Sequence, residues 1–344
     1  MNRPETLSPQ EIVRRDPKKV YELYDRWPAG AREALGSHVD LAEKNYARVV
    51  YLAVGGSATA GDIISDWFLS CGGVEVTVFR GSVPKMRLEG CLVIVCSTSG
   101  DTAETLAMAK ELMPGHPQMV AISAGGKLKE LADKEGIPHL LIGLNKAPRF
   151  TLPYSLFASI ATLRTAGLLK GVDSEPEETV DQLRGTAEAI NINAPAETNV
   201  SKRVAMAAVS GEPCIYASSV TKSVAWRFKN SLNENAKMHA TFAASPDFLH
   251  NEVEAWRIRD ARFHPMILQR PGDPASETSS LEAFSRVLRQ GGVEPTRVSS
   301  TGKGNLAQLM ELCYSLDVAS YYAGVLRGVE PFGIELIEDL KRAR

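Results

Sequence analysis

Two short turns in the sequence carry side chains that can bind an anion without a charged group. The stretch CLVIVCSTSGDTAET (91–105) is apolar up to Cys96 and then places four hydroxyl side chains around Gly100, namely Ser97, Thr98, Ser99 and Thr102. The second turn, Gly55-Gly56-Ser57, follows another apolar run. Hydroxyls donate hydrogen bonds to phosphate oxygens, and glycines let the backbone approach a ligand closely. Both turns therefore fit a phosphate, although each alone also fits an ordinary helix start, which needs one capping hydroxyl.

The elements that must position these turns alternate between strands and helices. Apolar runs at 49–54, 74–79, 92–96, 119–123 and 139–143 are separated by amphipathic segments, among them 102–113 and 127–135. This alternation predicts a parallel sheet covered by helices on both faces. Such sheets bind ligands at the carboxyl ends of their strands, beside helix N-termini, and both turns occupy that position. Because GGSATAG matches neither GxGxxG nor GxxxxGK[ST], a small phosphorylated metabolite fits better than a dinucleotide or a nucleoside triphosphate.

The second half of the chain repeats the pattern of the first. Strands are expected at 214–218, 265–269 and 296–300, with a strand-like run at 206–209, and helices at 220–235, 246–256, 277–290 and 304–327. A shift of 164 residues places YLAVGGSATAGDIISDWF over IYASSVTKSVAWRFKNSL, and a shift of about 172 places VIVCSTSGDT over MILQRPGDP. We infer two copies of one α/β unit. The second copy has lost the glycine and hydroxyl chemistry of the turns, so only the first is expected to hold an anion.

The predicted architecture is α/β, with two doubly wound parallel-sheet subdomains and flanking helices. Residues 9–46 are polar and helical in pattern, and a helix is expected at about 176–190 in an acidic connecting segment. The predicted divisions are an N-terminal helical lead-in (1–44), a first domain with the phosphate-binding turns (45–168), a linker with a helix (169–204) and a second domain with the C-terminal helix (205–344).

Composition argues against several classes of protein. The 344 residues are 44% hydrophobic and 23% charged, which is typical of soluble globular proteins. The 39 Lys and Arg and 41 Asp and Glu give a net charge of −2, so no strong field indicates a nucleic-acid or membrane partner. Five scattered cysteines without CxxC spacing are expected to be reduced thiols, most of them in the core. The N-terminal stretch lacks the apolar segment of an export signal, so the cytoplasm is the expected compartment.

Together, the two hydroxyl turns resemble the sugar isomerase (SIS) domain, whose phosphosugar loop has the form of residues 97–102. The segments FKNSLNENAKMHA (228–240) and SPDFLHNEVEAW (245–256) resemble the bifunctional phosphoglucose/phosphomannose isomerases. The resemblance runs from about residue 45 to the end and implies interconversion of glucose 6-phosphate and fructose 6-phosphate. It implies four catalytic residues: Glu234 as the base, His250 for ring opening, Arg149 in APRFTLPYSLF and Lys341 in IELIEDLKRAR.

The reaction itself calls for these residue types. Moving a proton between C1 and C2 through an enediolate requires one carboxylate, a role that suits Glu234. Negative charge that grows on the intermediate is stabilised by a fixed cation, here Arg149. Opening the sugar ring moves a proton between the ring oxygen and the C1 hydroxyl, which suits His250 assisted by Lys341. No metal and no redox cofactor is required.

Each of these residues also has a purely structural interpretation. Glu234 and His250 fit solvent-exposed positions, and His250 also fits a helix cap. Arg149 fits an ion pair with an acidic neighbour, and Lys341 fits a favourable interaction with the C-terminal end of a helix. His239 is a second histidine that could open the ring.

Two other functions remain open from the sequence. One is a non-catalytic sugar-phosphate-binding regulatory protein, which needs the hydroxyl turns but no base. The other is an isomerase or deaminating enzyme of aminosugar phosphates. The family's threonine near the terminal lysine, associated with mannose 6-phosphate, has no hydroxyl counterpart in the segment EPFGI (330–334), which leaves activity on that epimer open. The resemblance also implies a homodimer with shared active sites and a hexose phosphate as the small-molecule partner. The charge balance predicts no nucleic-acid partner and no membrane partner.

Overall fold

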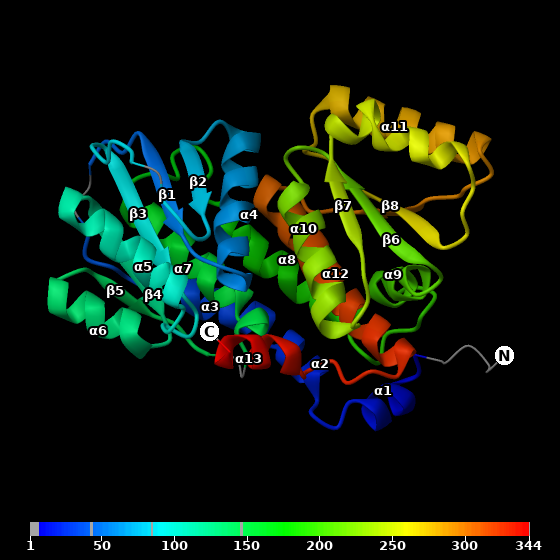
Figure 1. Cartoon of the computed structure of the whole chain (residues 1–344), viewed down its shortest axis with the longest axis horizontal. Helices are drawn as coiled ribbons and strands as arrows, with labels where there is room; N and C mark the ends of the chain where they lie inside the picture. The colour runs from blue at the N-terminus through cyan, green and yellow to red at the C-terminus, as the bar shows by residue number, and fades with distance from the viewer. Residues whose placement is uncertain (1–6, 42–43, 84, 145–146, 344) are drawn as a thin grey trace. The chain divides into compact units, whose positions relative to one another are not determined.

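The computed structural model describes residues 7–41, 44–83, 85–144 and 147–343. Within them the chain forms two compact units, each built around one parallel sheet (Figure 1). The first-sheet unit comprises the described residues of 26–182 and 303–307, and the second-sheet unit those of 1–25, 183–302 and 308–344. The α/β architecture with two parallel-sheet subdomains and flanking helices is therefore confirmed.

The first sheet has five parallel strands in the order β2-β1-β3-β4-β5. Their bounds are β1 Arg48–Leu52, β2 Glu75–Phe79, β3 Cys91–Cys96, β4 Gln118–Ser123 and β5 His139–Leu141. Every residue of β3 is buried, because β1 and β4 flank this strand and helices cover both of its faces. The helices of this unit are α3 Trp27–Leu35, α4 Gly56–Cys71, α5 Ala103–Leu112, α6 Gly126–Glu135 and α7 Leu152–Thr165, with the 3₁₀ helices η1 Met113–Gly115 and η2 Pro148–Phe150.

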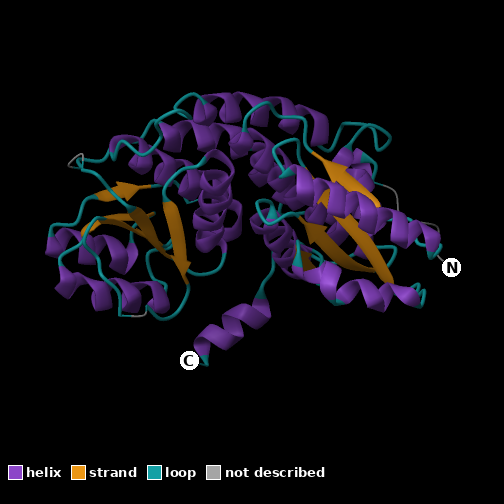
Figure 2. Cartoon of the chain, turned by 90° about the horizontal axis from the view of Figure 1, so that it is seen from above, coloured by secondary structure: helices purple, strands orange, loops and turns teal. Residues whose placement is uncertain are grey.

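Different helices cover the two faces of the first sheet. On one face Val93 packs in a hydrophobic cluster with Leu106 of α5 and Leu128 of α6. On the other face the hydroxyl of Tyr51 lies 3.0 Å from that of Ser159 on α7, within hydrogen-bond distance. In each unit the strands lie between helices (Figure 2). Because β1 pairs directly with β3, their carboxyl ends are neighbours, and both hydroxyl turns begin at this edge.

The second sheet has four parallel strands in the order β7-β6-β8-β9. Their bounds are β6 Glu212–Ala217, β7 Thr241–Ala244, β8 Phe263–Gln269 and β9 Thr296–Ser299. The helices of this unit are α1 Pro9–Arg15, α2 Val20–Asp25, α9 Val200–Ala208, α10 Lys222–Asn235, α11 Ala275–Gln290 and α13 Glu335–Arg342, with η3 Asp247–His250 and η4 Glu252–Arg257; α8 Glu175–Ile190 and α12 Asn305–Arg327 contribute residues to both units. Aromatic side chains fill part of its core, where the Tyr216 ring lies 4.8 Å from each of Phe248 and Phe284.

The two sheets share one strand order, since β2-β1-β3-β4 corresponds to β7-β6-β8-β9. β1 begins at residue 48 and β6 at residue 212, a difference of 164. β3 begins at residue 91 and β8 at residue 263, a difference of 172. These differences are the shifts that align the sequence with itself, so the topology supports the internal repeat.

Two expectations about local structure are wrong. The segment 246–256 is not one α-helix but the two 3₁₀ helices η3 and η4, separated at Asn251, whose φ of −147° and ψ of −66° are not helical. The strand-like run at 206–209 lies mostly in α9, where Asn199 caps the helix by accepting a hydrogen bond from the Lys202 N–H (3.0 Å). In both places the residue pattern of a short segment did not predict the secondary structure that the segment adopts in the folded chain.

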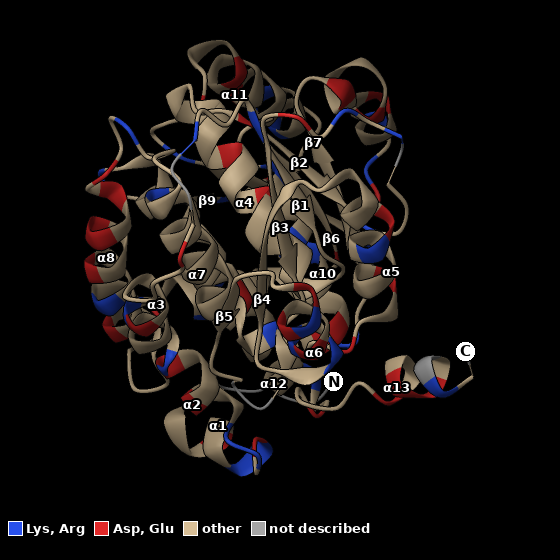
Figure 3. Cartoon of the chain, turned by 90° about the vertical axis from the view of Figure 1, so that its left-hand side faces the viewer, with Lys and Arg blue, Asp and Glu red and all other residues tan. Residues whose placement is uncertain are grey.

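The N-terminal lead-in is helical as expected, but it is not a polar extension. It forms α1, α2 and α3, and the side chains of Ile12 and Trp27 are fully buried. All five cysteines lie in described residues; none forms a disulfide, and four are buried. Positive and negative side chains are spread over many elements (Figure 3). No helix in the described part of the chain is long and apolar enough to span a membrane.

Two partly buried histidines make stability depend on pH. Burial lowers the pKa of His139, beside Lys129, and of His264 below the usual 6.5. Both side chains therefore favour the neutral form in the folded protein. Their contribution to the free energy of unfolding is complete above pH 6.5 and is lost as the pH falls through the pKa of the folded state. From pH 7 to 5 the free energy of unfolding should fall, by at most about 1.4 kcal/mol per pH unit for each histidine.

Urea unfolding at pH 7 and pH 5 checks this prediction. The double variant His139→Asn, His264→Asn should lose less unfolding free energy between these pH values than the wild type does. The exposed His38 provides a matched control, and His38→Asn should behave as the wild type. An equal loss in the wild type and the double variant would contradict the prediction.

Candidate active site

The first hydroxyl turn joins β1 to α4. Gly55 precedes the helix as its N-cap with a φ of +58°, a left-handed conformation that favours glycine. Gly56 and Ser57 form the beginning of α4, where backbone N–H groups have no earlier helical carbonyl to pair with. The turn therefore directs N–H groups and the positive end of the helix dipole towards the carboxyl edge of the sheet.

The second hydroxyl turn joins β3 to α5 and is held by close backbone contacts. Gly100 has a φ of +80°, and a Cβ atom at this position would lie 1.8 Å from the carbonyl oxygen of Gly125. The Gly100 carbonyl accepts a hydrogen bond from the Leu128 N–H (2.9 Å), and the Thr98 carbonyl accepts one from the Ala124 N–H (2.9 Å). Only glycine fits at residue 100, and the turn is fixed against the start of α6.

Buried hydroxyls join the two turns to each other. Ser57 Oγ accepts a hydrogen bond from the Thr98 N–H (3.1 Å) and lies 3.0 Å from Thr98 Oγ1. Thr98 Oγ1 also lies 3.3 Å from Ser155 Oγ on α7. Within the second turn, Ser97 Oγ donates to Thr102 Oγ1 (2.9 Å). Sequence reasoning missed Ser155, because one serine in a largely apolar helix gives no signal.

The remaining groups of the second turn are available to a ligand. Ser99 is exposed and Thr102 is half-buried. Ser99 Oγ accepts a hydrogen bond from the Asp101 N–H (3.3 Å), so its own O–H can still donate. Asp101 caps α6 by accepting a hydrogen bond from the Lys127 N–H (3.1 Å). Neutral hydroxyls and helix N-termini at this edge can together bind an anion.

Arg149 belongs to the same unit as the hydroxyl turns. It lies in η2 directly before α7, is only 6% exposed, and places its guanidinium 4.5 Å from the centre of the Phe150 ring. η2 packs against α4, the helix that begins at the first turn. The segment that carries this buried cation continues into α7, which carries Ser155.

Glu234 lies in the last turn of α10, in the second-sheet unit, with a half-buried side chain. Its carbonyl oxygen accepts a hydrogen bond from Lys237 Nζ (2.6 Å), which also donates to the Gly333 carbonyl (2.6 Å). Lys237, which sequence reasoning also missed, thus joins the end of α10 to the segment that precedes α13.

The other two predicted catalytic residues also belong to the second-sheet unit. His250 is exposed at the end of η3, and within the described residues it forms no hydrogen bond or ion pair with Glu234. Lys341 falls on α13, but its side chain lies outside the described residues. The structure therefore brings the hydroxyls of the two turns together and does not join His250 to Glu234.

The corresponding turns of the second sheet are filled by the chain's own side chains. The hydroxyls of Ser218 and Thr221 donate to Asp273 Oδ1 (2.5 and 2.7 Å). Ser219 donates through its N–H (2.7 Å) and its hydroxyl (2.6 Å) to the Glu277 carboxylate. These carboxylates take the donors that a phosphate would need, which supports the expectation that only the first copy holds an anion.

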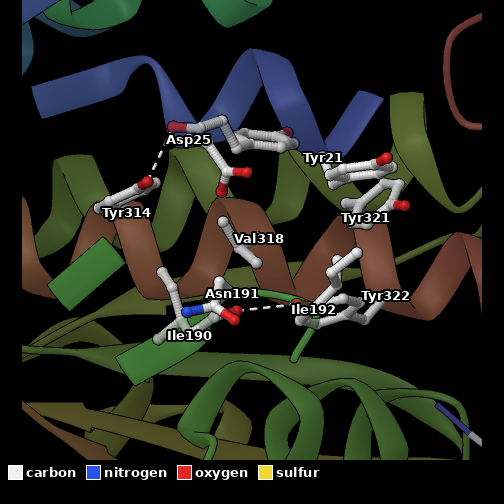
Figure 4. A pocket seen from close by; sticks show the side chains of 10 residues that line it. Tyr21, Asp25, Ile190, Asn191, Ile192, Tyr314, Val318, Tyr321 and Tyr322 are labelled. Carbon is white, nitrogen blue, oxygen red and sulfur yellow. Dashed lines mark hydrogen bonds between the residues drawn. The ribbon is translucent and has the colours of Figure 1, made fainter. Parts of the chain in front are cut away.

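Two cavities lie away from the hydroxyl turns. The tyrosine-lined pocket beside α2 and α12 has a volume of about 10 Å³, enough for a water molecule at most (Figure 4). A wider groove of about 450 Å³ lies at the amino ends of β1, β3 and β4, lined in part by Tyr46, Leu88 and His116, at the edge opposite the hydroxyl turns. Among the described residues, no group of three His, Cys, Asp or Glu side chains is placed to hold a metal ion.

Comparisons with known proteins give the family. A model of the bacterial phosphoglucose isomerase C-terminal SIS domain matches residues 197–343. A bifunctional phosphoglucose/phosphomannose isomerase from Pyrobaculum calidifontis is 30% identical over 309 residues, covering 89% of this chain and 91% of that protein. The chain belongs to the bifunctional phosphoglucose/phosphomannose isomerase family. The resemblance seen in the sequence is confirmed.

This member of the phosphoglucose/phosphomannose isomerase family is also similar to proteins that are named for other activities. A D-glucosamine-6-phosphate 4-epimerase from Sulfolobus acidocaldarius is also 30% identical, over 75% of this chain and 79% of that protein. The C-terminal domain of glucosamine-fructose-6-phosphate aminotransferase from Francisella tularensis shares the fold, with a TM-score of 0.69 and 14% identity, covering 91% of this chain and 97% of that one.

Proposed function

We propose that this protein interconverts glucose 6-phosphate and fructose 6-phosphate by proton transfer through an enediolate. The observation that carries the proposal is the hydrogen-bonded junction of the two hydroxyl turns through Ser57 and Thr98, in a member of an isomerase family. Other family members are named for both glucose and mannose phosphates, so mannose 6-phosphate is the second candidate aldose.

The hydroxyl turns supply the phosphate site. Ser57, Ser97 and Thr98 hold the turns in place through their mutual hydrogen bonds and burial. Ser99, Thr102 and the N-termini of α4 and α5 supply donors to the phosphoryl oxygens.

The proton transfers of the reaction are assigned to residues whose side chains have the required chemistry. Glu234 takes the proton from one of C1 and C2 and returns it to the other. The Arg149 guanidinium stabilises the negative charge of the enediolate and cannot lose its own proton at neutral pH. His250, assisted by Lys341, moves the proton that opens the sugar ring. We also propose that the enzyme works in the cytoplasm, and that it is a homodimer with shared active sites, as the family resemblance implies.

A second candidate is an epimerase or isomerase of aminosugar phosphates. The similarity to the D-glucosamine-6-phosphate 4-epimerase favours it, because that identity equals the identity to the named phosphoglucose/phosphomannose isomerase from P. calidifontis. An epimerase of this kind acts at C4, so it would not generate fructose 6-phosphate.

One assay separates these functions. The purified protein is incubated separately with glucose, mannose, fructose and glucosamine 6-phosphates, and the products are resolved by chromatography. Light scattering measures the mass of the protein in solution and so tests whether it is a dimer. Glucose 6-phosphate should yield fructose 6-phosphate, with slower conversion of mannose 6-phosphate because residues 330–334 lack a hydroxyl. Conversion of glucosamine 6-phosphate alone would establish the second candidate, and binding without any turnover would indicate a regulatory protein.

A further inference from the structure

The residue after the candidate base is held by two side-chain hydrogen bonds from other helices. Asn235 is fully buried, and its Nδ2 donates to the Tyr24 hydroxyl on α2 (2.8 Å) and to Ser320 Oγ on α12 (2.8 Å). Two partners from two helices use both protons of the amide, which fixes its orientation. All of these residues belong to the second-sheet unit.

The partners of Asn235 are themselves fixed. The Tyr24 carbonyl accepts a hydrogen bond from the hydroxyl of Tyr314 on α12 (2.7 Å). Ser320 Oγ donates to the Asp317 carbonyl (2.6 Å). The amide of Asn235 is therefore held by positions that cannot easily shift, and α2, an N-terminal helix, takes part in holding the end of α10.

Further along α10, the same face is fastened to α12. Arg227 forms a buried ion pair with Asp317 (2.7 Å), and Ser231 Oγ donates to the same carboxylate (2.6 Å). Residues 227, 231 and 235 follow at intervals of four, so they lie on one side of the helix. These contacts fix both the rotation and the position of α10 along its axis.

Close packing leaves no room for the end of α10 to adjust. A Cβ atom added to Gly324 of α12 would lie 2.5 Å from the Asn235 carbonyl oxygen, so this contact requires glycine. Glu234 is the preceding residue, on the same helical turn. Any rotation of that turn moves its carboxylate, and misplacing a catalytic group by about 1 Å can lower a rate about 100-fold.

We propose that Asn235, held by Tyr24 and Ser320, is a positioning residue that sets the direction of the Glu234 carboxylate. Asn235 itself does not touch the substrate. This inference rests on the proposed function, because it gives Glu234 the role of base. It assigns α2 a part in catalysis: the tyrosine hydroxyl of α2 is an anchor for the helix that carries the base.

The test compares two variants that each remove one buried tyrosine hydroxyl. Tyr24→Phe removes the acceptor of Asn235. Tyr322→Phe is the matched control, since its hydroxyl donates to the carbonyl of Ile190 (2.8 Å), the last residue of α8, and not to a residue of α10. The kcat and KM for fructose 6-phosphate and the thermal unfolding temperature are measured for both, with Ser320→Ala as a second variant of the anchor.

We expect Tyr24→Phe and Ser320→Ala to lower kcat by about 10-fold to 100-fold with KM within about 2-fold. Tyr322→Phe should lower the unfolding temperature by a similar amount and keep kcat within about 2-fold of the wild type. The wild type should be active and Glu234→Gln inactive. If, under these conditions, the kcat of Tyr24→Phe is no lower than that of Tyr322→Phe, this inference is overturned and the proposed function is not. An inactive wild type would overturn the proposed function and this inference with it.

Discussion

Glu234→Gln is expected to lower kcat for fructose 6-phosphate by about 100-fold to 10,000-fold, the range that a positioned general base supplies. The amide keeps the size and shape of the side chain but cannot accept and return a proton. Glu234 is half-buried at the end of a helix whose backbone is fixed by Asn235 and Lys237, so the substitution should leave the fold intact. Binding of fructose 6-phosphate, measured by calorimetry, should persist with a Kd close to that of the wild type.

A matched control comes from Glu212, a half-buried glutamate at the first residue of β6. It lies at the amino end of a strand, whereas ligands of parallel sheets bind at the carboxyl ends. Glu212→Gln should keep kcat within about 2-fold of the wild type. If Glu234→Gln turned over as fast as this control, the carboxylate would have no role as the base.

Arg149→Met should lower kcat by about 100-fold to 1,000-fold, because it removes the cation that stabilises charge in the transition state. The guanidinium is almost completely buried, so its field acts in a medium of low polarity. Arg149→Lys keeps the charge but loses the planar group, and should recover part of the rate. Steady-state kinetics with fructose 6-phosphate checks this prediction: kcat should be highest for the wild type, lower for Arg149→Lys and lowest for Arg149→Met.

The rival interpretation of Arg149 is structural, because its guanidinium lies over the Phe150 ring. Phe150→Leu removes that contact and keeps the charge, so it separates the two roles. We expect this variant to be less stable yet to retain more activity than Arg149→Met. The catalytic role is contradicted if Arg149→Met keeps the wild-type kcat, or if Phe150→Leu loses as much activity at a temperature where both variants are folded.

Much of the fold could be predicted from sequence because parallel strands are short apolar runs with clear borders. β3 is buried along its whole length and ends where four hydroxyls begin, so both the strand and the turn were visible in the residues 91–102. The repeat was detectable because the order of strand, small-residue turn and helix persists even where identity is low. The prediction of one α-helix at 246–256 was wrong because the residue pattern of this segment does not distinguish an α-helix from two 3₁₀ helices separated at Asn251.

The contacts that support the candidate site were not predictable in the same way. Ser155 meets Thr98 across 57 residues, and Asn235 meets Tyr24 across 211 residues. Neither pair has a local spacing that could reveal it, because the partners become neighbours only when helices pack. The proposed roles of Glu234 and Arg149 come from the family resemblance.

The most direct test of the central claim is a crystal structure of this protein with fructose 6-phosphate bound. The phosphoryl oxygens should lie within about 2.7–3.2 Å of the Ser99 and Thr102 hydroxyls and of N–H groups at the start of α5. A phosphate bound instead at the turns of the second sheet, or away from both sheets, would contradict the claim that the two hydroxyl turns hold the substrate.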